Sequence, residues 1–322
     1  MSSPILSIQN LKTHFATDDG LVKAVDGVSF DLSAGESLGI VGESGSGKTV
    51  TCMSALRLIS SPGFHPDGKI MFHGSDLLQC SERELKKIRG DRISMIFQDP
   101  MTSLNPFLKV GRQLTEVLEV HKQLSPNDAR HRCIEMLDRV GIPDATKRFD
   151  QYPHEFSGGM RQRVMIAMAL LCEPELLIAD EPTTALDVTI QAQILELIQD
   201  LKRDFKTSVI LITHDLGIVA GITTTIAVMY AGRIIEKGPT EEIFANPQHP
   251  YTQGLLRSVP RLDRPRDDDL SVIPGLPPDL SALPSGCPFH PRCDQAQQKC
   301  QTDYPDDVSI RPNHSASCWE IE

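Results

Sequence analysis

The chain contains Gly42-Glu43-Ser44-Gly45-Ser46-Gly47-Lys48-Thr49, which matches the phosphate-binding pattern G-x-x-x-x-G-K-[ST] at every fixed position. Residues 37–41, just before this stretch, predict a short buried strand, and residues 50–58, just after it, have the apolar spacing of a helix. The motif requires this order of strand, loop and helix. The surroundings therefore favour a nucleotide site over a chance glycine-rich turn.

Each part of this stretch suits the binding of a nucleotide. Gly42, Gly45 and Gly47, with Ser44 among them, leave backbone N–H groups open to phosphate oxygens at the start of a helix, whose dipole favours anions. We expect Lys48 to bridge the β- and γ-phosphates and Thr49 to hold Mg²⁺.

Composition limits the classes of protein to which the chain can belong. With 322 residues, 40% of them hydrophobic, it is long enough for about two domains. No apolar run approaches the roughly 18 residues of a membrane span, and the N-terminus does not have the pattern of a secretion signal. A formal net charge of −11 argues against a general nucleic-acid surface. We expect a cytoplasmic protein that reaches a membrane only through partners.

Two apolar segments near the N-terminus predict antiparallel strands that lead into the loop. Residues 5–15 and 22–32 flank the turn-forming Asp18-Asp19-Gly20. Phe15 ends the first of these strands. It can stack on an adenine ring, or it can belong to the core like most strand phenylalanines.

The middle of the chain predicts a helical insertion at about residues 80–165, followed by a return to strands. Residues 93–97 predict a strand that ends at Gln98-Asp99-Pro100, where Gln98 can reach a site or simply lie at the surface. The helical patterns cover residues 115–120, 128–140 and 161–172. Ser157-Gly158-Gly159, which precedes the last of these helices, offers a hydroxyl and bare N–H groups to an anion or forms an ordinary helix cap.

Two adjacent carboxylates follow a buried strand predicted at residues 176–179. After a phosphate loop, Asp180 is suitably placed for magnesium and Glu181 can orient the attacking water, whereas the alternative is a solvated acidic turn. His214 follows another buried strand, at residues 209–213, and either binds a phosphate oxygen or is structural.

The alternation of strands and helices predicts an α/β fold with a mainly parallel core sheet, closed by a hairpin at residues 226–236. Beyond Gly254 the chain is rich in proline, and its last part has four cysteines and little periodicity. We therefore predict a nucleotide-binding domain at residues 1–255 and a linker with a small irregular cysteine-containing segment at residues 256–322.

Taken in order, the motifs resemble those of the ATP-binding cassette (ABC) family. The matching positions are residues 42–49 as Walker A, Gln98 as the Q-loop glutamine, Phe156-Ser157-Gly158-Gly159-Met160 as the signature, residues 176–181 as Walker B, and Asp187 and His214. The resemblance covers about residues 5–250. It implies a RecA-like parallel-sheet core, an antiparallel β subdomain and a helical signature subdomain.

The same resemblance implies a role for each site residue. ATP would lie between the phosphate loop of one subunit and Ser157-Gly158-Gly159 of another. The remaining implied roles are Glu181 as general base, His214 on the γ-phosphate, Thr49, Gln98 and Asp180 at Mg²⁺, Gln98 also as a relay to the permease, Asp187 at the nucleotide site, and Phe15 on the adenine.

A closer resemblance comes from Asn246-Pro247-Gln248-His249-Pro250-Tyr251-Thr252 and Cys287-Pro288-Phe289-His290-Pro291-Arg292-Cys293. These segments resemble the ATPases of oligopeptide and dipeptide importers, in particular their D-type subunits. The resemblance implies a second, often different ATPase subunit, two transmembrane permeases and an extracytoplasmic peptide-binding protein. It places the chain on the cytoplasmic face of the inner membrane, with no role for nucleic acid.

Three functions other than peptide import predict different features of the sequence. A soluble cassette ATPase that acts on DNA or ribosomes predicts long coiled-coil insertions or tandem cassettes, and the sequence has neither. A nucleotide-binding regulator without turnover predicts a missing carboxylate at position 181, where Glu181 is present. An importer of another substrate, such as nickel, stays open.

Four of the eight cysteines, Cys287, Cys293, Cys300 and Cys318, lie close together near the C-terminus, with gaps of 5, 6 and 17 residues. Disulfides are disfavoured in the cytoplasm. Structural zinc sites usually contain a short C-x₂₋₄-C pair, which is absent here, whereas four thiolates on an irregular segment suit an iron–sulfur cluster. The resemblance also implies such a cluster. We therefore favour [4Fe–4S], with Zn²⁺ as the alternative and free thiols third.

Overall fold

The computed structural model describes residues 3–99, 103–184, 186–259 and 273–321, and the chain divides into two compact units. The first unit comprises residues 1–79 and 211–322, and the second comprises residues 80–210. Strand β8 (Ser208–Thr213) contains the point at which the chain passes from the second unit back into the first.

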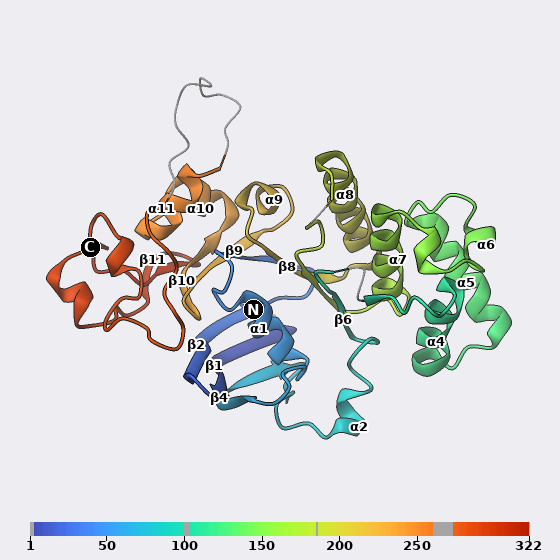
Figure 1. Ribbon diagram of the computed structural model, residues 1–322, viewed down its shortest axis with the longest axis horizontal. Coiled ribbons are helices and arrows are strands. Elements are labelled where there is room, and N and C mark those ends of the chain that lie inside the picture. The colour runs from blue at the N-terminus through green and yellow to red at the C-terminus, as the bar shows by residue number, and fades with distance from the viewer. Residues whose placement is uncertain (1–2, 100–102, 185, 260–272, 322) are drawn as a thin grey trace. The chain divides into compact units, whose positions relative to one another are not determined.

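The first unit contains an antiparallel sheet with the strand order β2-β1-β4-β5. Its strands are β1 (Leu6–Thr17), β2 (Gly20–Leu32), β4 (Gly63–Phe72) and β5 (Ser75–Asp76). Strands β1 and β2 pair around the turn at residues 18–19, which confirms the predicted hairpin. The sheet lies beside helix α1 (Lys48–Ala55) (Figure 1). Thr13 Oγ1 in β1 and Ser54 Oγ in α1 form a buried hydrogen bond of 2.9 Å.

A second sheet in this unit begins at the strand before the phosphate loop. Strand β3 (Ser37–Val41) is buried along its whole length and runs parallel to β9. The strand order continues from β3 through β9 (Thr225–Tyr230), β10 (Arg233–Pro239), β12 (His314–Ala316) and β11 (Val308–Arg311). Helices α9 (Leu216–Ala220), α10 (Thr240–Ala245) and α11 (Pro250–Arg257) belong to the same unit. Strands β9 and β10 form the predicted hairpin.

The second unit combines two parallel strands with helices. Its elements are β6 (Ile93–Ile96), β7 (Leu176–Asp180), α2 (Glu82–Leu85), α4 (Val110–Lys122), α5 (Pro126–Arg139), α6 (Ala145–Arg148), α7 (Gly158–Leu170), α8 (Val188–Phe205) and the 3₁₀ turn η1 (Pro153–Glu155). Of these helices, α4, α5 and α7 overlap the predicted helical patterns. Val110, Leu114 and Leu118 recur at every fourth position of α4 and are completely buried, so this apolar stripe fixes the face that packs inward.

The C-terminal segment, residues 273–321, contains more regular structure than its composition predicts. Its strand β12 pairs with β10, and β11 pairs with β12, so the segment extends the sheet of the first unit. The 3₁₀ turns η2 (His290–Arg292) and η3 (Gln298–Gln301) lie between the linker and these strands. Residues 260–272 of the predicted linker lie outside the described residues.

A buried acid–base contact explains why a segment without periodicity adopts this order. The Glu236 carboxylate in β10 is 2.9 Å from His314 Nε2 in β12, and both side chains are almost fully buried. Glu236 also accepts the N–H groups of Gln248 and His249 at 2.8 and 2.9 Å. A buried carboxylate is costly unless its oxygens are hydrogen-bonded, and here the donors come from two distant parts of the chain, residues 248–249 and His314.

None of the helices among the described residues is both long and apolar enough to cross a bilayer.

The first testable prediction concerns His249, which caps α11 by accepting the Tyr251 N–H at Nδ1 over 3.0 Å. Burial lowers the pKa of His249 to about 3. Since the pKa of a histidine in an unfolded chain is about 6.5, protons bind preferentially to the unfolded chain. The contribution of His249 to stability is therefore complete above about pH 6.5 and decreases as the pH falls, by up to about 1.4 kcal/mol per pH unit.

We expect His249→Asn, which keeps a capping acceptor but does not titrate, to show a weaker pH dependence of the free energy of unfolding than the wild type. Urea unfolding at about pH 7.5 and about pH 5 measures this difference. If both proteins lose the same free energy of unfolding between these pH values, the loss of stability does not come from the titration of His249.

Candidate nucleotide site

The phosphate loop, residues 42–49, has a backbone that only glycine can adopt at its two ends. Gly47 has φ +99°, and a Cβ there would overlap the carbonyl oxygen of Ala24 in β2. A Cβ on Gly42 would overlap the carbonyl oxygen of Met229 in β9. The loop is thus closely packed between two strands, and the sequence pattern G-x-x-x-x-G reflects this contact.

The polar groups of the loop fit an anion. Lys48 is 5% exposed, and its ammonium donates to the carbonyl oxygens of Gly42 and Glu43 at 2.7 and 2.9 Å. The Ser46 hydroxyl is buried and has no hydrogen-bond partner among the described residues. Buried hydroxyls are normally paired, so this one suits a phosphate oxygen. Ser46 occupies a variable position of the motif, and for this reason the sequence did not single it out.

The second unit holds the two predicted carboxylates at the end of β7. Asp180 is the last residue of the strand and is 2% exposed. Glu181 follows with φ +44°, a left-handed backbone that is strained for a residue with a side chain. Its Oε2 accepts hydrogen bonds from Gln98 Nε2 at 3.0 Å and from Thr184 Oγ1 at 2.8 Å. The structure therefore brings Gln98 and Glu181 together, and Thr184 is a contact that the sequence did not indicate.

The remaining candidates of the second unit lie at helix starts. Ser157 caps α7 by accepting the Met160 N–H at 3.3 Å, as in an ordinary helix cap. Ser157 and Gly158 are nevertheless exposed, and a Cβ on Gly158 would meet nothing within 4 Å. Asp187 is exposed at the N-cap of α8 and makes no side-chain capping bond there.

Two further candidates lie in the first unit. His214 is exposed and directly follows β8. Phe15 in β1 is half-buried, and its ring edge lies against Gly63, where a Cβ would meet it at 2.7 Å. The stacking of Phe15 on adenine stays a prediction.

The four C-terminal cysteines line one cavity of about 20 Å³, together with His249 and His290. All eight cysteines are free thiols, and burial raises the pKa of Cys287 to about 11. This space holds roughly one water molecule, much less than four irons and four sulfides need. In the part of the chain that the structure describes, no three His, Cys, Asp or Glu side chains are grouped so that they could hold a metal ion. The donors fit the predicted cluster in kind, but the space between them does not.

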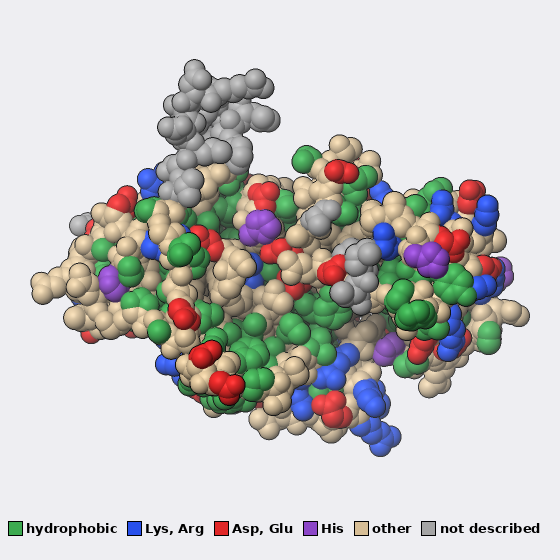
Figure 2. Space-filling view, in the orientation of Figure 1, with side chains coloured by type: hydrophobic (Ala, Val, Ile, Leu, Met, Phe, Trp, Pro, Cys, Tyr) green, Lys and Arg blue, Asp and Glu red, His purple; other side chains and the backbone are tan. Residues whose placement is uncertain are grey.

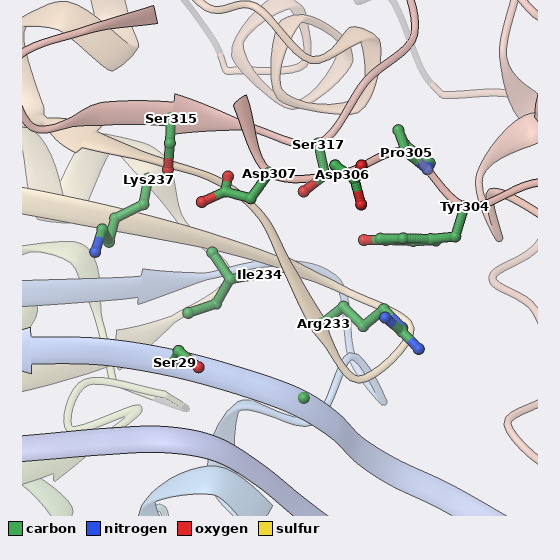
Figure 3. A pocket seen from close by; sticks show the side chains of 11 residues that line it. Ser29, Arg233, Ile234, Lys237, Tyr304, Pro305, Asp306, Asp307, Ser315 and Ser317 are labelled. Atoms are coloured by element: carbon green, nitrogen blue, oxygen red, sulfur yellow. The ribbon is translucent and has the colours of Figure 1, made fainter. Parts of the chain in front are cut away.

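A larger cavity of about 340 Å³ lies between the C-terminal segment and strands β2 and β10 (Figure 3). Tyr304, Asp306, Asp307 and Ser317 line one side of it, and Arg233 lies at its edge. The Arg233 guanidinium lies 4.4 Å from the centre of the Tyr304 ring and pairs with Asp26 of β2 at 2.6 Å. No residue of the phosphate loop lines this cavity.

Tyr251 and Arg292 contact the phosphate loop, although no local motif marks them as site residues. Tyr251 OH accepts the Glu43 N–H at 2.9 Å, and the Arg292 guanidinium binds both oxygens of the Glu43 carboxylate at 2.7 and 2.9 Å. Both residues occur in the segments that resemble importer ATPases. Only a pairwise signal between distant positions would have connected them to the loop.

A glycine-rich loop between a buried strand and a helix, with carboxylates at the end of another buried strand, is the arrangement of an ATP-binding cassette. Residues 25–184 match the family model described as ABC transporter, and residues 235–300 match the model described as oligopeptide/dipeptide transporter, C-terminal region. The chain is 54% identical over 317 residues to the oligopeptide transport ATP-binding protein OppD of Haemophilus influenzae, which covers 98% of this chain and 97% of that protein. It is 55% identical to the dipeptide transport ATP-binding protein DppD of Bacillus subtilis, over 98% of this chain and 94% of the relative.

Solved structures agree with these matches. The dimeric post-hydrolysis state of the cassette MJ0796, bound to ADP and Pi, has a TM-score of 0.66 at 25% identity and covers 73% of this chain and 98% of its own. The chain therefore belongs to the ABC transporter family and, within it, to the oligopeptide and dipeptide transport ATP-binding proteins. It is an ATPase of this family.

The packing of the phosphate loop gives the second testable prediction. We expect Gly47→Ala to abolish ATP binding, because the added Cβ meets the backbone of Ala24 and the loop must shift. Gly35→Ala is the matched control, since Gly35 has φ +75° but nothing within 4 Å of its Cβ position. The control should lose about 1–2 kcal/mol of stability from backbone strain and bind ATP normally. Fluorescent ATP binding and thermal unfolding measure both effects, and normal binding by Gly47→Ala would contradict the packing argument.

Proposed function

We propose that this chain hydrolyses ATP to power the import of peptides through a membrane transporter. The observation that carries the proposal is the match of the C-terminal region, residues 235–300, to the region characteristic of oligopeptide and dipeptide transporters. The named relatives transport oligopeptides or dipeptides and match along almost the whole chain. A cassette that acts on DNA or ribosomes has no comparable support.

In the proposed mechanism, the phosphate loop binds the phosphates of ATP through its backbone N–H groups and Lys48. Thr49, Asp180 and Gln98 would hold Mg²⁺, which would supply positive charge to the phosphate oxygens. Glu181 orients the attacking water and accepts its proton, and its hydrogen bonds with Gln98 and Thr184 support this role by restricting the carboxylate.

The other site residues complete the proposed site. His214 binds the γ-phosphate, Phe15 stacks on the adenine, and Asp187 lies at the nucleotide site. The signature residues Ser157-Gly158-Gly159 contact the nucleotide held by a second subunit. The exposure of Ser157 and Gly158 at the start of α7 supports a contact with another chain.

We propose that the partners are a second, non-identical cassette ATPase, two transmembrane permeases and an extracytoplasmic peptide-binding protein. The chain then lies on the cytoplasmic face of the inner membrane, attached through the permeases. Exposed apolar side chains near Gln98 in the chain support such a contact: Phe97 is 42% exposed and Phe107 is 86% exposed. Figure 2 shows hydrophobic side chains at the surface of the helical unit, on the right.

The proposed function predicts that Glu181→Gln binds ATP but does not turn it over, because an amide cannot accept the proton of the water. In a strain that lacks the gene, the wild type should restore uptake of labelled di- to pentapeptides, and Glu181→Gln should not. ATP binding and phosphate release by the purified variant separate the two steps. Turnover within about twofold of the wild type would exclude Glu181 as the base.

Lys48→Ala serves as the comparison variant. It removes the positive charge from the β- and γ-phosphates and should lose nucleotide binding itself.

If the wild type restores uptake of nickel rather than of peptides, the ATPase assignment stands and the peptide assignment is wrong.

We also propose that Cys287, Cys293, Cys300 and Cys318 bind a [4Fe–4S] cluster with a structural role. Their convergence on one cavity supports the proposal, whereas the small volume of that cavity requires the side chains to move apart for binding. Protein purified without oxygen should be brown, with about four irons per chain, and Cys293→Ser should lose the colour. A colourless protein with one zinc per chain, or with no metal, would refute the cluster.

A further inference from the structure

Glu43, the second residue of the phosphate loop, is held at each of its polar groups. Its N–H donates to Tyr251 OH at 2.9 Å, and its carbonyl oxygen accepts from Lys48 Nζ at 2.9 Å. Arg292 Nη1 donates to its Oε2 at 2.7 Å and Nη2 to its Oε1 at 2.9 Å. This paired geometry is the strongest form of a carboxylate hydrogen bond and fixes both distance and plane.

Arg292 is itself held in one position by the C-terminal segment. It is 8% exposed, its Nε donates to the Pro274 carbonyl oxygen at 2.9 Å, and its Nη1 lies 3.3 Å from Tyr230 OH. The rings of Tyr230, Tyr251 and Phe289 pack against one another with centroids 4.6–5.3 Å apart. The hydrogen bonds to Glu43 raise the pKa of Arg292 above its usual value, so its charge is permanent.

The charge of this pair matters because Glu43 is an anion within a loop that binds anions. A carboxylate at this position repels the phosphates of ATP unless a cation balances it, and the side chain of Glu43 is only 26% exposed, which limits screening by water. The guanidinium provides that balance and also fixes the backbone from which the phosphate-binding N–H groups project.

We propose that Arg292 of the C-terminal segment is a positioning residue for ATP binding, which acts by neutralising and anchoring Glu43 of the phosphate loop. The inference rests on the proposed binding of ATP phosphates at this loop. It assigns to the transporter-specific C-terminal region a direct part in the nucleotide site of its own chain. Hydrolysis itself does not require Arg292, because it contacts neither water nor phosphate in this role.

The test is a double-mutant cycle on Glu43 and Arg292. Arg292→Gln should raise the KM for ATP by about tenfold or more with little change in kcat, because it leaves an unpaired carboxylate beside the phosphates. Glu43→Gln should have a smaller effect. The double variant Glu43→Gln/Arg292→Gln should bind ATP better than Arg292→Gln alone, because the repelling charge is then gone. Added salt should also partly restore binding to Arg292→Gln and leave the wild type less affected.

Two further variants keep the test decisive. Arg311→Gln breaks another arginine–glutamate pair that joins the C-terminal segment to the cassette, Arg311 to Glu242 at 2.5 Å, and should leave the KM unchanged. Tyr251→Phe removes the acceptor of the Glu43 N–H, keeps the ring packing, and should raise the KM by about two- to tenfold. If Arg292→Gln does not fold, the KM values of Tyr251→Phe and Glu43→Gln for ATP still test the contacts that hold Glu43.

Additive effects of the two substitutions, or an unchanged KM in Arg292→Gln, would refute the positioning role. A loss of binding in Lys48→Ala together with normal binding in Arg292→Gln would refute this inference and leave the proposed nucleotide site intact. Normal binding in both variants would refute the site as well.

Discussion

A loop that binds phosphate through bare backbone N–H groups cannot use those groups to stabilise itself, so its shape depends on its neighbours. In this chain the neighbours come from distant segments: β2 and β9 pack against Gly47 and Gly42, the Gly232 N–H donates to the Ser46 carbonyl oxygen at 3.0 Å, and Tyr251 and Arg292 bind Glu43. Much of the first unit is arranged so that these contacts occur together.

The C-terminal segment packs against the cassette and supplies some of these contacts. It contains few core residues, yet β12 pairs with β10, and the buried Glu236 carboxylate binds the N–H groups of Gln248 and His249, just before α11, and His314. Strand addition also covers an edge of the sheet that would otherwise expose unpaired backbone groups. The segment is ordered by polar contacts with the cassette, and its Phe289 ring packs on Tyr230 and Tyr251.

The sequence predicted most of the strands and several of the helices because their patterns are local. The phosphate loop, the strand before it and the carboxylates after β7 are each recognised within about ten residues. The left-handed backbone of Glu181, the unpaired Ser46 hydroxyl and the Arg292 contact could not be predicted, because each depends on packing between segments far apart in the chain. The sequence underestimated the order of the C-terminal segment for the same reason, because its partner strand β10 lies about eighty residues earlier in the chain.

The distance along the chain between Glu43 and Arg292 also sets an order of assembly. The two residues are 249 positions apart, and a ribosome that adds roughly 5–20 residues per second needs about 10–50 s to pass from one to the other. Throughout this interval the nascent phosphate loop carries an unbalanced negative charge. On the proposed role of Arg292, the phosphate loop reaches its full affinity for ATP only after the C-terminal segment has been synthesised and has docked on it.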